Sequence, residues 1–252
     1  MSITRKAAAA VAALGLATAC STIAVLSEGS ASAATPPCAQ RCYDIFSKQF
    51  GNHGQPSFVL SVASKSATVG NPIIMYWQSN DNPAEDFIAT RQGTVSSFNQ
   101  ANLVSDAVNL HYGSDYAYEY EYAPYGVDTG LCIGTATTAV AGSKVSLQPC
   151  GASAGTVWIV DSYDGRYTNG WYGGWYGGWW GGGDQPLING SDTNFSRPLV
   201  LTYPPGAFPS NNPRPQLYTT NLTGSTVAND GNPYLKGVSS SQLWSWDRGP
   251  LP

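Results

Sequence analysis

The sequence lacks the residue patterns on which common catalytic sites are built. Among 252 residues there are two histidines, His53 and His111, and they stand in unlike surroundings. No Gly-x-Ser-x-Gly, His-Glu-x-x-His or glycine-rich phosphate-binding motif occurs. Histidines without a neighbouring nucleophile or second ligand are usually surface or loop residues. We therefore expect no enzyme activity, no catalytic residues, no bound metal and no cofactor.

Basic residues are also scarce. The chain has 12 Lys and Arg against 16 Asp and Glu. Removal of residues 1–33, for the reason given below, takes away Arg5, Lys6 and Glu28, which leaves 10 basic and 15 acidic residues and a net charge of −5. Proteins that bind nucleic acid usually need a basic surface that displaces counterions from the phosphates. We therefore expect no nucleic-acid partner.

Long apolar runs are missing except near the start of the chain. Residues 7–26 are apolar, follow the basic pair Arg5-Lys6 and precede Ala31-Ser32-Ala33, a small-residue cleavage motif. We interpret residues 1–33 as a secretory signal peptide, of an Ala-rich type that suggests a bacterial source. The mature chain is then secreted and keeps no membrane anchor. A retained anchor and a lipoprotein signal at Cys20 are the alternatives, although Cys20 lacks the large aliphatic residue that normally precedes it.

What the chain does have is a set of short alternating strands that occurs three times. Apolar and polar residues alternate between turn-forming Gly, Ser and Pro, which is typical of strands rather than helices. Each copy has a first strand, a second strand and a closing aromatic strand, beginning at residues 57, 130 and 198. No copy could bury its apolar face alone, so we predict three copies around one shared core. A β-sandwich is the alternative.

The middle copy resembles one repeat of the ricin B-type lectins. Repeats of that family read C-[VIL]-D, then V-Q-L-W-x-C, then Q-x-W. The chain has Cys-Ile-Gly at 132–134, Val-Ser-Leu-Gln-Pro-Cys at 145–150 and Thr-Val-Trp at 156–158. The resemblance implies an all-β fold, a β-trefoil with enlarged loops.

The implied domain organisation follows from the same three copies. An amino-terminal segment at 34–56 precedes a trefoil at 57–252. The repeats are expected at about 57–128, 129–196 and 197–252. A Gly/Trp/Tyr-rich insertion at 170–183 interrupts the chain between the second and third strand sets.

Four cysteines remain after removal of the signal peptide, and export favours disulfides over free thiols. The lectin-like repeat implies a bridge between Cys132 and Cys150. Cys38 then pairs most simply with Cys42, as a local staple. A bridge from Cys38 or Cys42 to the other pair is the alternative.

The resemblance also implies where a sugar would bind. A binding-competent repeat of the family carries an Asp after the first strand, an aromatic residue after the second and the Gln of Q-x-W. The aromatic ring stacks on the sugar, and the carboxylate accepts hydrogen bonds from hydroxyl groups. The middle repeat has none of the three. The first keeps the aromatic residue Tyr76, and the third keeps Tyr218 and Gln242, so the third pocket is the most complete.

The insertion at 170–183 repeats two aromatic residues and two glycines, and it holds four of the eight tryptophans. Glycine cannot pack a core. The rings either stack on a sugar, a protein or a lipid interface, or fold back over one end of the trefoil. Under the first interpretation the ligand-binding residues include Trp171, Trp175, Trp179 and Trp180.

Two groups of acidic residues are the remaining candidates for chemistry. As a strand, residues 115–122 place four tyrosines on one face, and Glu119 and Glu121 on the other. A pair of carboxylates could serve a glycosidase, but we favour a solvated strand face. Asp81, Glu85 and Asp86 are interpreted as turn-capping residues.

Together these features predict a secreted, non-catalytic, lectin-like binding module for a carbohydrate or a cell-surface polymer. A protein-interaction or protease-inhibitor β-trefoil is the first alternative, and a glycosidase that uses Glu119 or Glu121 is the second. N-x-[ST] sequons begin at Asn189, Asn194 and Asn221, and they matter in a host that glycosylates them.

Overall fold

The structure is a computed structural model that describes residues 38, 41–47, 58–79, 82–136, 138–160, 185–204, 207, 211–220 and 239–248. All of them belong to one compact unit, Thr35–Pro252. The expected signal peptide at 1–33 and the insertion at 170–183, with its four tryptophans, lie outside the described residues and stay predictions. Within the described ranges, no helix has the length and apolar character that a membrane crossing requires.

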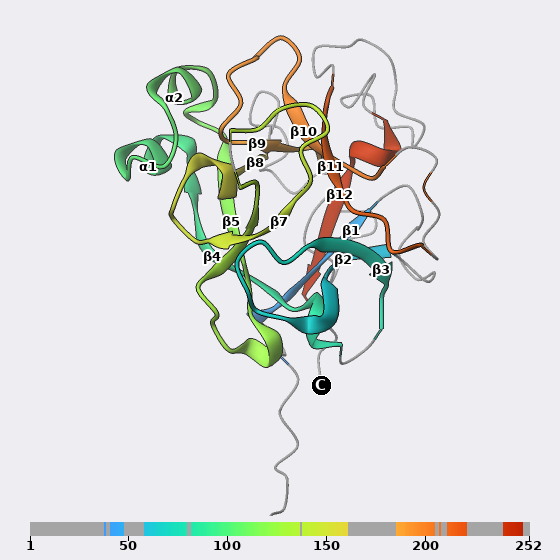
Figure 1. Ribbon diagram of the computed structural model, residues 1–252. Coiled ribbons are helices and arrows are strands. Elements are labelled where there is room, and N and C mark those ends of the chain that lie inside the picture. The colour runs from blue at the N-terminus through green and yellow to red at the C-terminus, as the bar shows by residue number, and fades with distance from the viewer. Residues whose placement is uncertain are drawn as a thin grey trace, which may run out of the picture. The chain divides into compact units, whose positions relative to one another are not determined.

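Three groups of four strands follow one another along the chain, and we call them units 1, 2 and 3 (Figure 1). Unit 1 has β1 (Tyr43–Ser47), β2 (Phe58–Val62), β3 (Ile73–Trp77) and β4 (Phe87–Thr94). Unit 2 has β5 (Tyr116–Tyr122), β6 (Leu131–Gly134), β7 (Ser146–Pro149) and β8 (Trp158–Val160). Unit 3 has β9 (Leu187–Asn189), β10 (Leu199–Thr202), β11 (Gln216–Thr219) and β12 (Trp244–Arg248).

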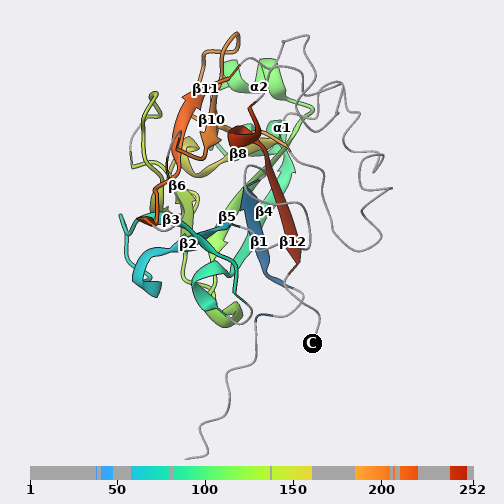
Figure 2. The ribbon, with the colours of Figure 1, turned by 90° about the vertical axis from the view of Figure 1, so that its right-hand side faces the viewer.

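The first and last strands of each unit form a closed barrel. β1 pairs with β4, β4 with β5, β5 with β8, and β8 with β9. Gln185, just before β9, bridges Trp244 of β12. The ring closes because β12 pairs along its whole length with β1, so that the two ends of the fold lie side by side (Figure 2).

The middle strands of each unit form a hairpin, and the three hairpins are joined in a triangle over the barrel. The backbone N–H of Leu147 in unit 2 donates to unit 1, that of Leu217 in unit 3 donates to unit 2, and that of Met75 in unit 1 donates to unit 3. A barrel of six strands capped by three such hairpins is a β-trefoil, as predicted. A β-sandwich is excluded because the ring of strands has no open edges.

Equivalent aromatic residues hold each unit to the core. The Trp158 indole N–H donates to the carbonyl of Ile133 at 2.9 Å, and the Trp244 N–H donates to the carbonyl of Leu201 at 2.8 Å. These carbonyls belong to corresponding strands, β6 and β10. Phe87 takes the same place in unit 1 and is also fully buried, but it has no N–H to donate. The closing aromatic strands found in the sequence are therefore barrel strands.

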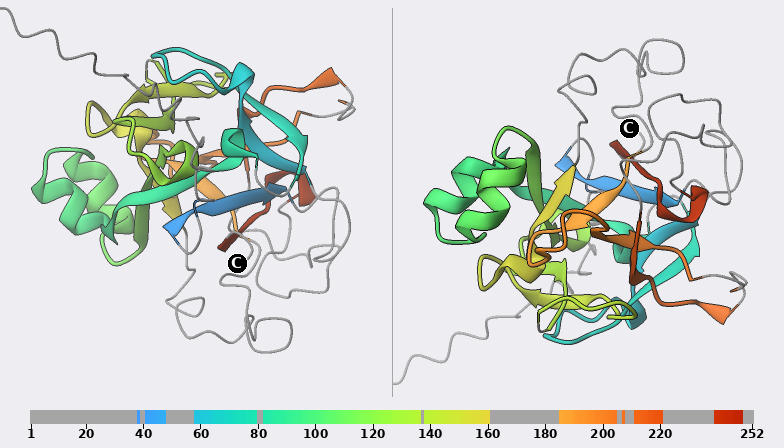
Figure 3. Two further views of the ribbon diagram at one scale, coloured as in Figure 1. Left: turned by 90° about the horizontal axis from the view of Figure 1, so that it is seen from below. Right: turned by 90° about the horizontal axis from the view of Figure 1, so that it is seen from above.

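The connection between β4 and β5 contains the two α-helices of the described chain, α1 (Val95–Gln100) and α2 (Asp106–Tyr112). Thr94 and Ser105 cap their first turns with side-chain oxygens that accept N–H bonds. The helices bury a second apolar cluster against β8, β9 and β10, and they stand at one side of the barrel (Figures 1 and 3). This is one of the enlarged loops expected from the sequence.

The trefoil begins earlier than residue 57. β1 lies inside the segment 34–56 that the sequence analysis set apart, and each unit starts with a barrel strand rather than with its hairpin. The sequence pattern misses β1 because its five residues include no close copy of the other barrel strands. Its barrel position is instead decided by pairing with β12, which is some 200 residues away in sequence.

Both predicted disulfides are present. Cys132 of β6 and Cys150, which directly follows β7, are joined at the open end of the unit 2 hairpin, with a Cα–Cα distance of 4.9 Å. Cys38 and Cys42 form the local staple before β1, with a Cα–Cα distance of 5.6 Å. The alternative connectivity between the two pairs is therefore wrong.

Candidate functional site

In unit 3, Tyr218 and Gln242, the residues implied by the lectin resemblance, bond to groups of their own unit. Gln242 is the last residue of a 3-10 turn, η8 (Ser240–Gln242), and is buried. Its side-chain amide donates to the Thr202 hydroxyl and to the Thr219 carbonyl, each at 3.3 Å. The Tyr218 hydroxyl donates to the side-chain oxygen of Gln216 at 3.4 Å. Gln242 therefore holds β10 and β11 together, and its amide is not turned toward solvent.

Corresponding turns in the other two units carry different residues at the same place. They are η4 (Pro83–Glu85) and η6 (Ala154–Thr156), and their last residues are also buried. The Thr156 hydroxyl donates to Glu119 Oε1 at 2.6 Å. Glu85 accepts hydrogen bonds from the Asn82 side chain and, at 3.1 Å, from the Ser79 backbone N–H. The Q-x-W position is structural in all three units, and unit 1 alone places a carboxyl group there.

Glu85 is one member of a group of three acidic side chains under the unit 1 hairpin. Asp44 is nine per cent exposed and accepts a hydrogen bond from the Gln78 side chain at 2.9 Å. Burial raises the pKa of Asp44 to about 6, and the charge of Asp86 adds to the increase. Burial likewise raises the pKa of Glu85 to about 7, against the hydrogen bonds from Ser79 and Asn82. The turn-capping interpretation holds for Glu85, but its burial was not foreseen, and Asp81 lies outside the described residues.

Unit 1 also exposes a tryptophan, in the residue before Gln78. Trp77 ends β3 and is 48% exposed, while its ring lies 4.1 Å from the Phe58 ring, centroid to centroid. Phe58 is buried, so it fixes the tryptophan ring from one side. Gln78 follows directly and bonds Asp44. Sugar-binding sites combine an exposed aromatic ring with amide and carboxyl groups, and here the residue after the exposed tryptophan provides the amide that bonds Asp44.

Tyr125 contacts one of these acids, Asp86. It is 42% exposed and has a positive φ of 56°, a conformation that costs a bulky residue energy. Its backbone N–H donates to Asp86 Oδ2 at 2.8 Å, and this bond helps to hold the strained turn η5 (Pro124–Gly126). We call Asp44, Trp77, Gln78, Asp86 and Tyr125 the unit 1 site.

Sequence reasoning found one residue near this site. Tyr76 is 42% exposed, but it precedes Trp77 on β3 and so points to the opposite side of the strand. Tyr76 and Trp77 are adjacent aromatic residues at the end of one strand, and this pattern in the sequence could have identified Trp77 as a second candidate. Asp44 and Tyr125 gave no such signal, because they reach the site through β1 and η5, which are remote in sequence.

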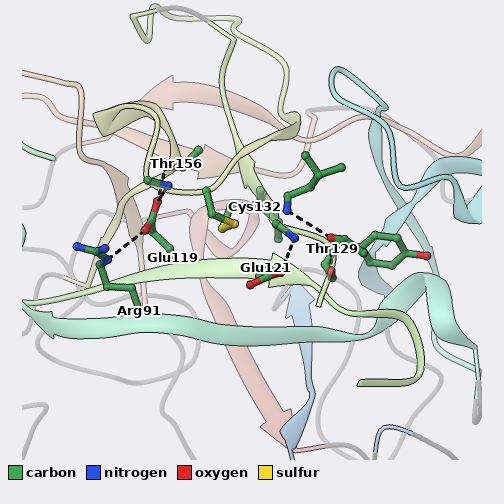
Figure 4. Close-up of a disulfide and its surroundings, with 12 residues drawn as sticks. Arg91, Glu119, Glu121, Thr129, Cys132 and Thr156 are labelled. Carbon is green, nitrogen blue, oxygen red and sulfur yellow. Dashed lines mark hydrogen bonds and ion pairs between the residues drawn. A yellow bond between two sulfur atoms is a disulfide. The ribbon is translucent and has the colours of Figure 1, made fainter. Parts of the chain in front are cut away.

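Glu119 and Glu121 lie on one face of β5, as predicted, but the expectation that this face is solvated is wrong. Glu119 is 1% exposed and Glu121 is 4% exposed. Glu119 Oε1 also accepts the Gly151 N–H at 2.8 Å, and Glu121 Oε1 accepts the Gly130 N–H at 2.6 Å. Glu121 bonds the residue just before β6, and Glu119 bonds the segment that follows β7, where it is directed toward Thr156 (Figure 4).

The described residues include one group of side chains whose spacing could suit a metal ion. Cys38, Cys42 and Asp86 place one ligand atom each within 4.8 Å of one another. Both sulfurs belong to a disulfide, however, and a thiolate is the form that binds metal. This group therefore does not fit a metal ion in the structure as it stands.

The pairing of barrel and cap makes this chain a β-trefoil protein. No protein-family model matches the sequence, and no curated protein matches it. One similar solved structure is the designed threefold symmetric protein ThreeFoil, with a TM-score of 0.47, 12% identity, and coverage of 82% of this chain and 97% of that chain. A mosquitocidal holotoxin gives a TM-score of 0.47 and 14% identity over 83% of this chain, which spans 17% of the toxin chain. A Caenorhabditis elegans protein of unknown function gives a TM-score of 0.43 and 11% identity, over 87% of this chain and 99% of that one.

Proposed function

We propose that the protein is a secreted, non-catalytic binding module, a divergent relative of the ricin B-type lectins. Its ligand is a carbohydrate or another cell-surface polymer, and the unit 1 site contacts it. The observation that carries the proposal is the exposed Trp77 ring, backed by Phe58 and followed by the Gln78–Asp44 hydrogen bond. A ring held in this way can stack on the apolar face of a sugar at little cost in side-chain entropy.

The strain at Tyr125 supports the same site. Non-glycine residues with positive φ persist where the surrounding structure compels them, and they cluster at binding sites. Tyr125 presents a half-exposed ring and keeps its conformation through a bond to Asp86, an acid of the same group. Trp77 and Tyr125 would then both contact the polymer.

We also propose that the protein has no glycosidase activity. The two carboxylates that could have served a glycosidase are covered and accept hydrogen bonds from loop N–H groups. Their burial and these bonds support a structural role, because a general acid or nucleophile must reach its substrate.

Replacement of Trp77 by Ala is expected to weaken polymer binding at least tenfold, since a tryptophan anchor often contributes 2 kcal/mol or more, roughly, to binding. Tyr125→Gly removes the second ring and places at this position the residue that best tolerates a positive φ. The measurement is binding of the mature chain to a panel of insoluble and soluble polysaccharides, by co-sedimentation and calorimetry. Val140→Ala is the matched control, because Val140 is 62% exposed and lies in unit 2.

Two further variants separate this site from the sites implied by the sequence. Loss of binding in Tyr218→Ala, with Trp77→Ala unaffected, would move the ligand to unit 3. Loss of binding on deletion of residues 170–183 would assign it to the insertion and to Trp171, Trp175, Trp179 and Trp180. No binding to any polymer by the wild-type chain would contradict the lectin-like proposal.

A protein-interaction module, including a protease inhibitor, is the second candidate. One observation favours it: Leu110 on α2 is 91% exposed, on a helical pair that stands at one side of the barrel. Large exposed apolar side chains on a protruding element suit contact with another protein. Inhibition of a protease that is lost in Leu110→Asp and kept in Trp77→Ala would favour this function over the first.

A further inference from the structure

Two of the three N-x-[ST] sequons fall on described residues of unit 3, and the fold treats them in opposite ways. Asn189 ends β9, and Asn194 lies in the connection from β9 to β10. Each asparagine is followed two residues later by a serine, so sequence alone does not distinguish them. The difference between them lies in burial and hydrogen bonding.

Asn189 is built into the barrel. Its side chain has no exposed surface, and its amide nitrogen donates to the Gly155 carbonyl at 3.0 Å. The amide oxygen accepts bonds from the N–H and the hydroxyl of Ser191, at 3.2 and 2.6 Å. The next residue, Gly190, has no room for even a methyl group, because an added Cβ would come within 2.9 Å of Val157. A sugar on Nδ2 of Asn189 cannot be accommodated in this fold.

Asn194 is exposed, and its loop holds it in a defined turn. Its backbone N–H donates to Asp192 Oδ1 at 3.0 Å, and its carbonyl accepts the Arg197 N–H at 3.2 Å. The exposed Ser196 donates its hydroxyl to Asn194 Oδ1 at 3.0 Å. The loop thus engages the carbonyl side of the amide, and no bond among the described residues engages Nδ2.

Phe195, between the two sequon residues, anchors the loop. Its ring stacks on His111 of α2 with 4.5 Å between the ring centroids, and it packs on the apolar cluster beneath α1 and α2. The middle residue therefore points inward while Asn194 and Ser196 face solvent. This arrangement leaves space for a bulky hydrophilic group on Asn194.

We infer that Asn194 is an N-glycosylation acceptor of this chain and that Asn189 is not. In the reaction, Nδ2 attacks the anomeric carbon of an oligosaccharide carried on a polyprenyl diphosphate. The bond from that carbon to the diphosphate oxygen breaks, Nδ2 loses a proton, and the lipid diphosphate leaves. The enzyme and the lipid-linked donor come from a glycosylating host.

The test is secretion of residues 34–252 from a eukaryotic cell, behind the host's own signal. Asn221 lies outside the described residues, so the tests use an Asn221→Gln background. Cleavage before Asp192 separates the two sequons, and peptide mass spectrometry before and after treatment with peptide N-glycosidase then reports each site. We expect a glycan on Asn194 in most secreted molecules, none on Asn189, and an unchanged melting temperature after removal of the glycan.

Two variants sharpen the result. Asn194→Gln and Ser196→Ala should each abolish the glycan, and Ser196→Ala does so with the asparagine still present. Asn189→Gln should leave glycosylation unchanged in any protein that is secreted. An unmodified Asn194 in secreted protein, or a glycan on Asn189 in folded protein, would overturn the inference.

Discussion

The free energy of unfolding is expected to fall by about 4 kcal/mol as the pH rises from 5 to 8, because of Asp44 and Glu85. Their folded-state pKa values are raised from 3.8 to about 6 and from 4.5 to about 7, with burial as the main cause. Between about pH 4 and pH 7 the folded chain therefore binds more protons than the unfolded chain. This stabilisation is fully present below about pH 4 and is lost as the pH rises through the folded pKa values.

The three units supply an internal comparison for this effect. Asp44 of β1 and Glu119 of β5 take corresponding positions, each two residues before the residue that pairs with its own hairpin. Glu119 faces the hydroxyl donor Thr156 and, at 3.5 Å, the Arg91 guanidinium. At the place of Thr156, unit 1 has another acid, Glu85. Unit 1 thus buries two carboxyl groups at the positions where unit 2 buries one carboxylate and a hydroxyl donor, with the half-exposed guanidinium of Arg91 nearby.

Glu85→Gln should remove more than half of the pH dependence, measured by urea unfolding at several pH values between 5 and 8. The matched control is Gln242→Glu, which places a carboxyl group in the corresponding turn of unit 3 and should make the decline steeper. A wild-type stability that stays flat or increases from pH 5 to 8 would show that these acids do not titrate as the structure indicates. An equal slope in Glu85→Gln would assign the effect to other groups.

Glu119→Ala is expected to cost about 3 kcal/mol of stability, which is the second large effect. The substitution removes the acceptor of the Thr156 hydroxyl and of the Gly151 N–H, and it leaves Arg91 without its ion-pair partner. Buried donors without acceptors account for most of the cost. Glu119→Gln should cost less, because an amide oxygen can still accept these two bonds.

The ion pair itself is expected to contribute little. The Arg91 side chain is 46% exposed, and solvent screens its attraction to Glu119. A double-mutant cycle of Arg91→Ala and Glu119→Gln, followed by chemical unfolding, should give a coupling energy of about 1 kcal/mol or less. Glu119→Ala within about 0.5 kcal/mol of the wild type would contradict the structural role of the carboxylate. A polysaccharide-hydrolysis assay on Glu119→Gln and Glu121→Gln separately checks the glycosidase alternative.

Sequence alone predicted the fold class because each unit carries its own local signals. Alternating residues around Cys132, the two closing tryptophans and the small residues at turns define strands without reference to distant parts of the chain. The Cys132–Cys150 pairing followed from a motif in which both cysteines belong to one hairpin. Residues 115–122 were correctly predicted as a strand with its tyrosines on one face, because alternation is a local property.

Tertiary structure decided the position of β1, the burial of the acids and the composition of the unit 1 site. β1 has a place in the barrel because β12 pairs with it, and no local pattern records that contact. Glu119 was predicted to be solvated because alternation along a strand shows only on which face a side chain lies. It does not show whether other parts of the chain cover that face. Trp77, Asp44 and Tyr125 belong to three separate elements, β3, β1 and η5, and the tertiary hydrogen bonds from Gln78 to Asp44 and from Tyr125 to Asp86 link these elements to the acids.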